Sequence, residues 1–198
     1  MKKTLLAIAA VTALLASGCS APTPATPASS SVPASSAVVQ DTDAMLARHG
    51  MAGLSPREVV ETMDQDPSPR PLPMVASVRY DQVVLADEQG EVTMPLDGED
   101  FYLSIAPYVT FTHDCYFHNL GTCQGELAGE TVHVNITTEG GDVLVDEEAT
   151  LQANGFVGFW LPRDVAGTVT VTYDGKTAVS PFSSDPEGPT CLTTLELK

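Results

Sequence analysis

The spacing of apolar residues divides the chain into three zones. Residues Leu5 to Leu15 form a nearly unbroken apolar run, and the stretch up to position 40 has no regular pattern. From Asp41 to Asp64 the apolar residues recur at helical spacing, and from Val75 onward they alternate with polar residues. Because apolar residues recur every three or four positions in a helix and every second position in a strand, this pattern predicts short helices followed by a β-rich part.

Two short helices are predicted within residues 41–66. The first covers Asp41 to His49, and Gly50 provides a C-terminal stop. The second begins at Ser55-Pro56, a pair typical of an N-cap and a first helical position, and extends to about Asp64. We expect both helices to pack on a larger neighbouring structure.

Residues 74–198 are predicted to form strands joined by turns. The segments are separated by turn signals that contain glycine, of which Asp174-Gly175 is the strongest. The expected strands are Val75–Leu85, Glu91–Leu96, Phe101–Thr112, Thr131–Ile136, Val143–Val145, Phe156–Leu161, Thr168–Tyr173, Thr177–Phe182 and Cys191–Leu197. The predicted fold class is mainly β (α+β): an antiparallel β-sandwich-like domain preceded by a small two-helix segment.

Residues 1–18 have the features of a secretory signal peptide. Lys2 and Lys3 precede the apolar run, and small residues lead to Cys19. The run is too short to cross a bilayer, which needs about 20 residues. Ala16-Ser17-Gly18-Cys19 resembles the lipobox of bacterial lipoproteins, in which the cysteine carries the lipid. The alternative is an ordinary secreted protein in which Cys19 has no special role.

Residues 19–40 are then predicted to be a lipidated cysteine followed by a tether. The tether consists almost entirely of Ala, Pro, Ser, Thr and Val, which give too little large apolar surface for a core and too much proline for a helix. Such a protein is exported. It is held at the membrane by its lipid anchor only, and it faces the periplasm or the extracellular side.

The charge of the chain limits its partners. The formal net charge of −17 becomes −19 when the signal peptide leaves with its two lysines. A chain with this charge repels nucleic acid and anionic lipid headgroups, so neither is an expected partner. The acidic residues are scattered along the sequence, which indicates a solvated surface.

The chain has four cysteines, and lipidation of Cys19 would leave three for the folded domain: Cys115, Cys123 and Cys191. An odd number of thiols in an oxidising compartment needs an explanation. Either one thiol is free beside a disulfide, or all three act together on a metal ion.

Two histidines, His113 and His118, lie close to Cys115 and Cys123 in the sequence. If the preceding strand continues through Cys115, then His113 and Cys115 face the same side of it, and the next loop can return Cys123 toward them. Cys191 can reach such a site only through the fold. Thiolate and imidazole ligands select Cu(I), with zinc as the alternative.

A plain disulfide between Cys115 and Cys123 explains the same residues. Cys191 would then be a buried apolar thiol, and the two histidines would be loop residues. The spacing is not a standard zinc signature, so from the residues alone the metal site and the disulfide have equal weight. The sequence contains no recognisable Ser/His/Asp set and no phosphate-binding loop, so a conventional enzyme is not predicted.

The segment from His113 to Leu127, HDCYFHNLGTCQGEL, resembles the signature of the CueP family of periplasmic copper-binding proteins linked to copper resistance. Further stretches share the resemblance: 154–156 with 160–163, 170–175 and 190–194. The resemblance covers the chain from about residue 41 to its end and is most specific at the three cysteines. The lipobox and tether depart from the family, whose better-known members are soluble in the periplasm.

The resemblance implies a copper site formed by Cys115, Cys123 and Cys191 with one or both of His113 and His118. It implies that these redox-active cysteines bind Cu(I) and reduce Cu(II), and that copper passes to an acceptor in the cell envelope. It also implies a helical part beside a β domain and a chain able to form a homodimer.

The expected function is that of a cell-envelope copper-binding protein that contributes to copper resistance. It would sequester or deliver Cu(I) as a chaperone and reduce Cu(II) stoichiometrically with its thiols, and a thioredoxin-like thiol reductase would restore the cysteines. Two alternatives remain open. One is a lipoprotein binding module with a structural Cys115–Cys123 disulfide, and the other is an envelope thiol–disulfide redox protein. Only the resemblance ranks copper above zinc.

Overall fold

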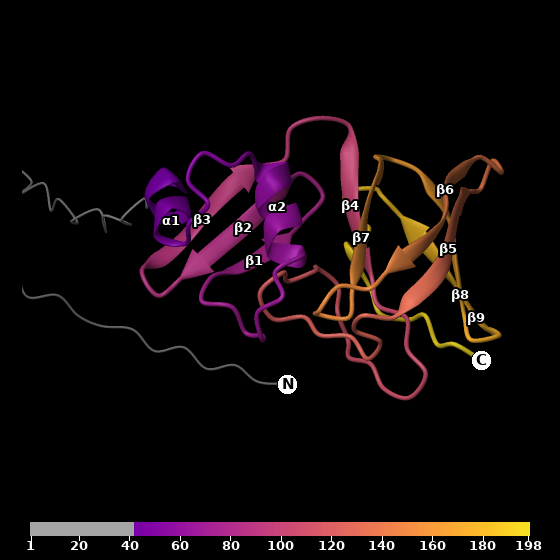
Figure 1. Cartoon of the computed structure of the whole chain (residues 1–198). Helices are drawn as coiled ribbons and strands as arrows, with labels where there is room; N and C mark the ends of the chain where they lie inside the picture. The colour runs from indigo at the N-terminus through magenta and orange to yellow at the C-terminus, as the bar shows by residue number, and fades with distance from the viewer. Residues whose placement is uncertain (1–41) are drawn as a thin grey trace, which may run out of the picture. The chain divides into compact units, whose positions relative to one another are not determined.

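A computed structural model describes residues 42–198 as two helices and ten strands (Figure 1). The signal peptide, Cys19 and the tether therefore lie outside the described residues, and their assignments stay predictions. The elements are α1 (Thr42–Arg48), α2 (Pro56–Asp64), β1 (Val75–Val78), β2 (Gln82–Asp87), β3 (Gly90–Pro95), β4 (Asp100–Ile105), β5 (Thr131–Thr138), β6 (Val143–Thr150), β7 (Val157–Pro162), β8 (Ala166–Tyr173), β9 (Lys176–Ser183) and β10 (Cys191–Leu192).

The described strands form three sheets, with the orders β1-β2-β3, β10-β4-β7 and β6-β5-β8-β9. Neighbouring strands are antiparallel, with one exception. The short strand β10 runs parallel to β4, so that Cys191 lies opposite Ser104. A residue close to the C-terminus is thereby placed next to the strand that leads into the cysteine- and histidine-rich loop.

The two helices pack against the sheet of β1, β2 and β3 and share one hydrophobic core with it (Figure 1). Met45 of α1 and Val59 of α2 are fully buried in this core, together with Val83 and Leu85 of β2. The helices are too short to be stable alone in water, so their stability comes from this apolar contact.

The other two sheets face each other as a sandwich around a second core. Strand β4 contributes to both cores, because successive side chains of a strand point to opposite sides. Phe101 and Leu103 face the sandwich core, whereas Tyr102 faces the core of the helices. The observed arrangement confirms the predicted fold class of a mainly β structure with a small helical part.

Two of the strand predictions covered too many residues for one strand, whereas the expected strand Val143–Val145 was too short and continues to Thr150 as β6. The expected strand Val75–Leu85 is divided into β1 and β2 by a tight turn, in which the Arg79 N–H donates to the Gln82 carbonyl at 2.8 Å. The expected strand Cys191–Leu197 is reduced to the two residues of β10 and a separate bridge between Glu196 and Tyr108. An alternating apolar pattern can continue through a turn, so the pattern alone does not mark such a break.

A third strand prediction matters more for function. The expected strand Phe101–Thr112 ends at Ile105, shortly before Pro107. Proline has no N–H to donate to a sheet, and this favours the end of the strand. Cys115 and His113 consequently lie in a loop, so the expectation that they share one face of a strand was wrong.

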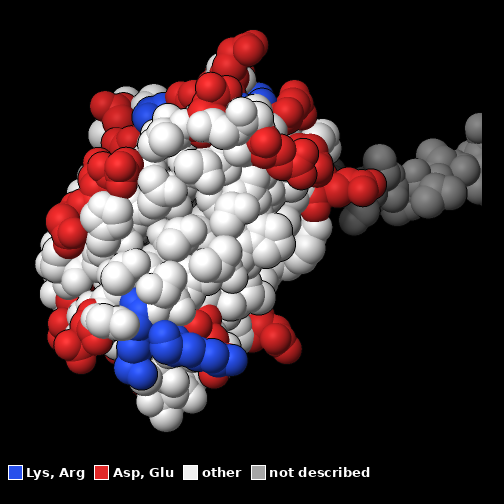
Figure 2. Space-filling model, turned by 90° about the vertical axis from the view of Figure 1, so that its right-hand side faces the viewer, with Lys and Arg blue, Asp and Glu red and all other residues white. Residues whose placement is uncertain are grey.

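The surface of the described part carries more acidic than basic side chains. Figure 2 shows one face with acidic residues along its margin, a small basic group at its lower edge and a largely uncharged centre. Within β8 on this side of the molecule, the exposed or half-buried Thr168, Thr170 and Thr172 alternate with buried valines.

Neither described helix is long and apolar enough to span a membrane.

Helix α2 begins with a capping box. The Ser55 hydroxyl accepts a hydrogen bond from the Glu58 N–H at 3.3 Å, and the Glu58 carboxylate accepts one from the Ser55 N–H at 2.8 Å. Both bonds satisfy N–H groups that have no partner within the helix. The cap fixes where α2 starts and hence where its last residue, Asp64, is placed.

The Ser55→Ala variant should lower the free energy of unfolding by about 1 kcal/mol, because the Glu58 N–H loses its acceptor. Urea unfolding followed by circular dichroism measures this difference. Thr62→Ala, on the exposed side of the same helix, is the matched control and should cause no loss. Equal losses in the two variants would contradict a specific role of the cap.

Candidate copper-binding site

The cysteine- and histidine-rich segment belongs to the long loop between β4 and β5, and part of it lies along the edge of β1. The Val78 N–H donates to the His118 carbonyl at 2.8 Å, and the Leu120 N–H donates to the Ala76 carbonyl at 2.9 Å. Leu120 is fully buried in the core of the helices. Backbone pairing and an apolar anchor therefore hold His118 in place although it is on a loop.

A tight turn returns the chain after His118. The Asn119 carbonyl accepts hydrogen bonds from the N–H groups of Thr122 at 3.2 Å and Cys123 at 2.9 Å. The Asn119 side chain accepts another from the Gly121 N–H at 3.0 Å. The Cys123 sulfur in turn accepts the Asn119 N–H at 3.4 Å. These bonds place the Cys123 thiol beside the residues that precede the turn.

Cys115 and Cys191 form a disulfide, with 5.7 Å between their Cα atoms, and Cys123 is a buried free thiol. The alternative of a Cys115–Cys123 disulfide was therefore wrong. The reason is the parallel pairing of β10 with β4, which brings Cys191 to the loop. The backbone N–H of Cys191 also donates to the Tyr116 carbonyl at 3.1 Å. The sequence contains no local signal for this contact.

The ligand atoms of all five expected residues converge around Cys123. The Cys123 sulfur lies 3.6 Å from the Cys115 sulfur. Two groups have ligand atoms within 4.8 Å of one another: His113, Cys115 and Cys123 form one, and His118, Cys123 and Cys191 form the other. Cys123 belongs to both groups, so the two are halves of one continuous cluster of sulfur and nitrogen atoms.

His113 reaches the cluster from the loop. Its Nε2 atom is shielded from solvent and has no hydrogen-bond partner within the described residues. A buried polar atom without a partner is costly and needs an explanation, and a bound ion would provide one here. The expectation that His113 and Cys115 approach each other holds, although a loop and not a strand brings them together.

One wall of the cluster is apolar. Phe156 is fully buried and shares a small core with Ala106, Cys123 and Cys191. Its ring centroid lies 4.7 Å from that of His118. An apolar wall limits water around the sulfurs and strengthens the electrostatic interactions among the neighbouring groups.

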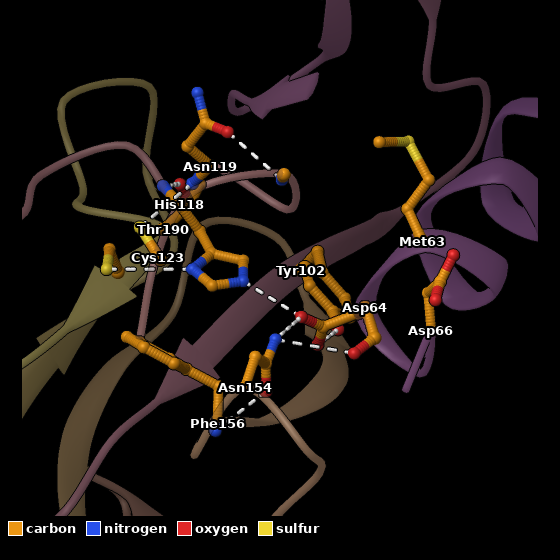
Figure 3. A network of polar contacts seen from close by, with 12 residues as sticks. Met63, Asp64, Asp66, Tyr102, His118, Asn119, Cys123, Asn154, Phe156 and Thr190 are labelled. Carbon is orange, nitrogen blue, oxygen red and sulfur yellow. Dashed lines mark hydrogen bonds and ion pairs between the residues drawn. The ribbon is translucent and has the colours of Figure 1, made fainter. Parts of the chain in front are cut away.

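His118 is fully buried, and its two ring nitrogens face different partners. Nδ1 lies 3.7 Å from the Cys191 sulfur, and Nε2 lies 3.0 Å from the Asp64 carboxylate (Figure 3). Asp64 also accepts hydrogen bonds from the Tyr102 hydroxyl at 2.5 Å and from the Asn154 side-chain amide at 2.9 Å. The His118 imidazole therefore lies between the cysteine sulfurs and the Asp64 carboxylate, which Tyr102 and Asn154 also hold in place.

The environment shifts the pKa values of this pair toward the charged forms. Burial alone would lower the pKa of His118, but hydrogen bonds and negative charge from Asp64, with a contribution from Cys123, raise it to about 9. Burial alone would raise the pKa of Asp64, but His118, Tyr102 and Asn154 hold it below its usual value. A metal ion that binds Nδ1 must therefore displace a proton from His118.

Sequence reasoning missed the residues that hold His118. Asp64, Tyr102 and Asn154 lie on α2, on β4 and in the loop before β7, far from His118 in the sequence. The local sequence pattern predicts Asp64 at the end of a helix and indicates no role for it. One feature of the sequence could have indicated a role for Asp64. It is a carboxylate on the face of α2 that is otherwise formed by buried hydrophobic residues.

Comparisons with known proteins find a copper-binding family and a solved structure that are similar to this chain. A family model described as the periplasmic copper-binding protein CueP matches residues 58–196. A crystal structure of a protein named S.CueP is similar to this chain, with a TM-score of 0.77 and 42% sequence identity. The similarity covers 82% of this chain and 100% of that one. A comparison with curated protein sequences gives no match.

Gly158 on β7 leaves the space that the Tyr102 hydroxyl occupies beside Asp64. A methyl group at this position would overlap the Tyr102 hydroxyl and ring. Gly158→Ala should displace Tyr102 and lower the free energy of unfolding by about 1–3 kcal/mol, as overpacking typically does. Gly140→Ala, in the turn between β5 and β6, would meet side-chain atoms only at the ordinary contact distances of 3.6 and 3.8 Å and should have a much smaller effect. Urea unfolding of both variants checks this, and equal stabilities would contradict the packing of Tyr102 against β7.

Proposed function

The chain belongs to the CueP family of periplasmic copper-binding proteins, and from this premise we propose that it binds Cu(I) through its three domain cysteines and reduces Cu(II) with them. It is a copper-binding protein of the cell envelope. The proposed ligands are Cys115, Cys123 and Cys191, with His113 and His118 as the nitrogen donors.

The observation that carries this proposal is the shared position of Cys123. The Cys123 sulfur lies within 4.8 Å of the ligand atoms of one cysteine and one histidine in each of two groups. Thiolate and imidazole ligands suit Cu(I) and disfavour the hard cations that prefer oxygen. The buried Nε2 atom of His113, which has no partner among the described residues, supports the same assignment.

The thiols and the disulfide correspond to two chemical states of the cluster. When Cys115 and Cys191 are reduced, three sulfurs are available to Cu(I). When they form the disulfide, only the Cys123 thiol and the two imidazoles remain as free donors. Oxidation of the cysteines therefore removes the ligands that Cu(I) prefers, and this couples copper release to the redox state of the cluster.

The proposed reduction is stoichiometric. The Cys115 and Cys191 thiols lose two protons to solvent and two electrons to copper, and a sulfur–sulfur bond forms between them. Each Cu(II) accepts one electron, so one disulfide corresponds to two Cu(I) ions. A thiol reductase, of thioredoxin-like chemistry, would then supply two electrons and two protons to open the disulfide.

The proposal includes a role for Cys123 in thiol exchange. Its sulfur lies 3.6 Å from Cys115, one partner of the disulfide. Attack of the Cys123 thiolate on Cys115 would form a Cys115–Cys123 bond and release Cys191 as a thiolate beside His118. The exchange conserves electrons and would allow either Cys123 or Cys191 to face an incoming copper ion or reductase.

The proposed cellular role is copper resistance, in which the chain sequesters Cu(I) and passes it to an acceptor in the envelope. The proposal includes export by residues 1–18, lipidation of Cys19 and a tether up to residue 40. Zinc at the same ligands and thiol–disulfide exchange without copper are the competing functions, and the two experiments below separate them.

The first experiment is a titration of the reduced full-length chain with Cu(I), without oxygen, against a chromophoric competitor. One Cu(I) per chain should bind tightly, and the variant in which Cys115, Cys123 and Cys191 are all serine should lose that binding. His133→Ala is the control, because His133 pairs with Asp146 on the surface of the sandwich. Tighter binding of zinc than of Cu(I), or no competition at all, would overturn the proposal.

The second experiment measures reduction of Cu(II) by the reduced chain. About two Cu(I) should appear per chain, and mass spectrometry after alkylation should find a Cys115–Cys191 disulfide with Cys123 alkylated. Cys115→Ser should lose this product. Full thiol-exchange activity toward a disulfide substrate, without any reduction of Cu(II), would favour the redox protein instead.

A further inference from the structure

The geometry points to Asp64 as the residue that positions His118 for copper, an inference that rests on the proposed function. The hydrogen-bond partners of the Asp64 carboxylate are His118, Tyr102 and Asn154, and Asp64 is not proposed as a ligand. It would act through His118, by accepting the hydrogen bond of Nε2–H and thereby presenting the lone pair of Nδ1 to the metal.

The orientation of the imidazole supports this role. Nε2 lies 3.0 Å from Asp64, and Nδ1 faces the sulfur atoms from the opposite side of the ring (Figure 3). A neutral imidazole has one N–H and one lone pair, and the partner of the N–H decides which nitrogen can bind a metal. With Asp64 as acceptor, the Nε2 proton is retained, and the proton that copper would displace from His118 is the one on Nδ1.

The carboxylate is itself held firmly. Asp64 is 2% exposed, and its two oxygens accept hydrogen bonds from Tyr102 and Asn154 in addition to His118. The Asn154 amide also donates to the Asp64 backbone carbonyl at 3.3 Å. Donors from three separate segments thus converge on one side chain.

This arrangement makes the helical part of the chain a component of the copper site. Asp64 is the last residue of α2, which packs on the sheet of β1, β2 and β3. The ligands lie on the loop between β4 and β5 and on β10. Carboxylates that hold a metal-binding histidine in this way typically change metal affinity by about 10–100-fold.

Asp64→Asn tests the inference, because asparagine keeps the shape of the side chain and removes its charge. In the full-length chain we expect the Cu(I) affinity, measured by competition, to fall by about 10–100-fold. In the His118→Ala background the same substitution should cause no further loss, since the residue would act only through His118. Asp66→Asn is the matched control, because Asp66 lies two residues away and caps the Ser68 N–H instead.

A spectroscopic readout separates positioning from mere stability. Cu(I) has a filled d shell, so nitrogen NMR of the loaded chain, labelled at histidine, can report the two ring nitrogens of His118. The unsubstituted chain should show a proton on Nε2 and metal-shifted Nδ1, and Asp64→Asn should lose this single pattern. Thermal unfolding shows whether each variant is folded. If Asp64→Asn does not fold, Asp64→Glu, which retains a displaced carboxylate, replaces it in the same comparison.

The outcomes separate this inference from the proposed function. Failure of the unsubstituted chain to bind Cu(I) would overturn the proposed function and the role of Asp64 together. Tight binding by the unsubstituted chain, with unchanged affinity in Asp64→Asn, would overturn the role of Asp64 alone. An equal loss with and without His118 would also overturn it, because Asp64 would then act on stability and not through the histidine.

Discussion

A carboxylate and an imidazole lie side by side in the interior, where helix α2 meets the loop after β4. Removing one partner of such a buried pair typically costs about 3–5 kcal/mol, because the other is left as an uncompensated charge. Asp64 and His118 satisfy this demand for each other, and Tyr102 and Asn154 complete the hydrogen bonds. Because these groups are buried and need partners, α2, β4 and the two loops that carry His118 and Asn154 are held in contact with one another.

The pair of Asp64 and His118 lies next to the cluster of cysteine sulfurs, so the contacts that stabilise the fold also orient a residue of the candidate site. Because Nε2 of His118 is engaged by Asp64, the other side of the ring is directed at Cys191 and Cys123. The apolar ring of Phe156 covers the same imidazole. Contacts with Asp64 and Phe156 thus fix the orientation of the His118 ring, while the neighbouring sulfurs can exist as thiols or as a disulfide.

The position of Cys123 links these redox states. It is free and buried, and it lies close to Cys115, whose partner is Cys191. Soft thiolate ligands and exchangeable disulfides require the same sulfur atoms at the same short separations. Under the proposed function, the same sulfur atoms would bind copper and undergo the redox chemistry.

The sequence by itself determined the fold class, the two helices and most strands, because these follow from local apolar periodicity and capping residues such as Ser55. It also determined the identity of the copper-ligand candidates, because cysteine and histidine are few and His113 to Leu127 forms a specific signature. The tertiary structure alone decided that Cys191 pairs with Cys115, and that Asp64 holds His118. Both contacts join residues more than fifty positions apart. Their partners are chosen by strand order and by the packing of α2, which no local pattern of residues encodes.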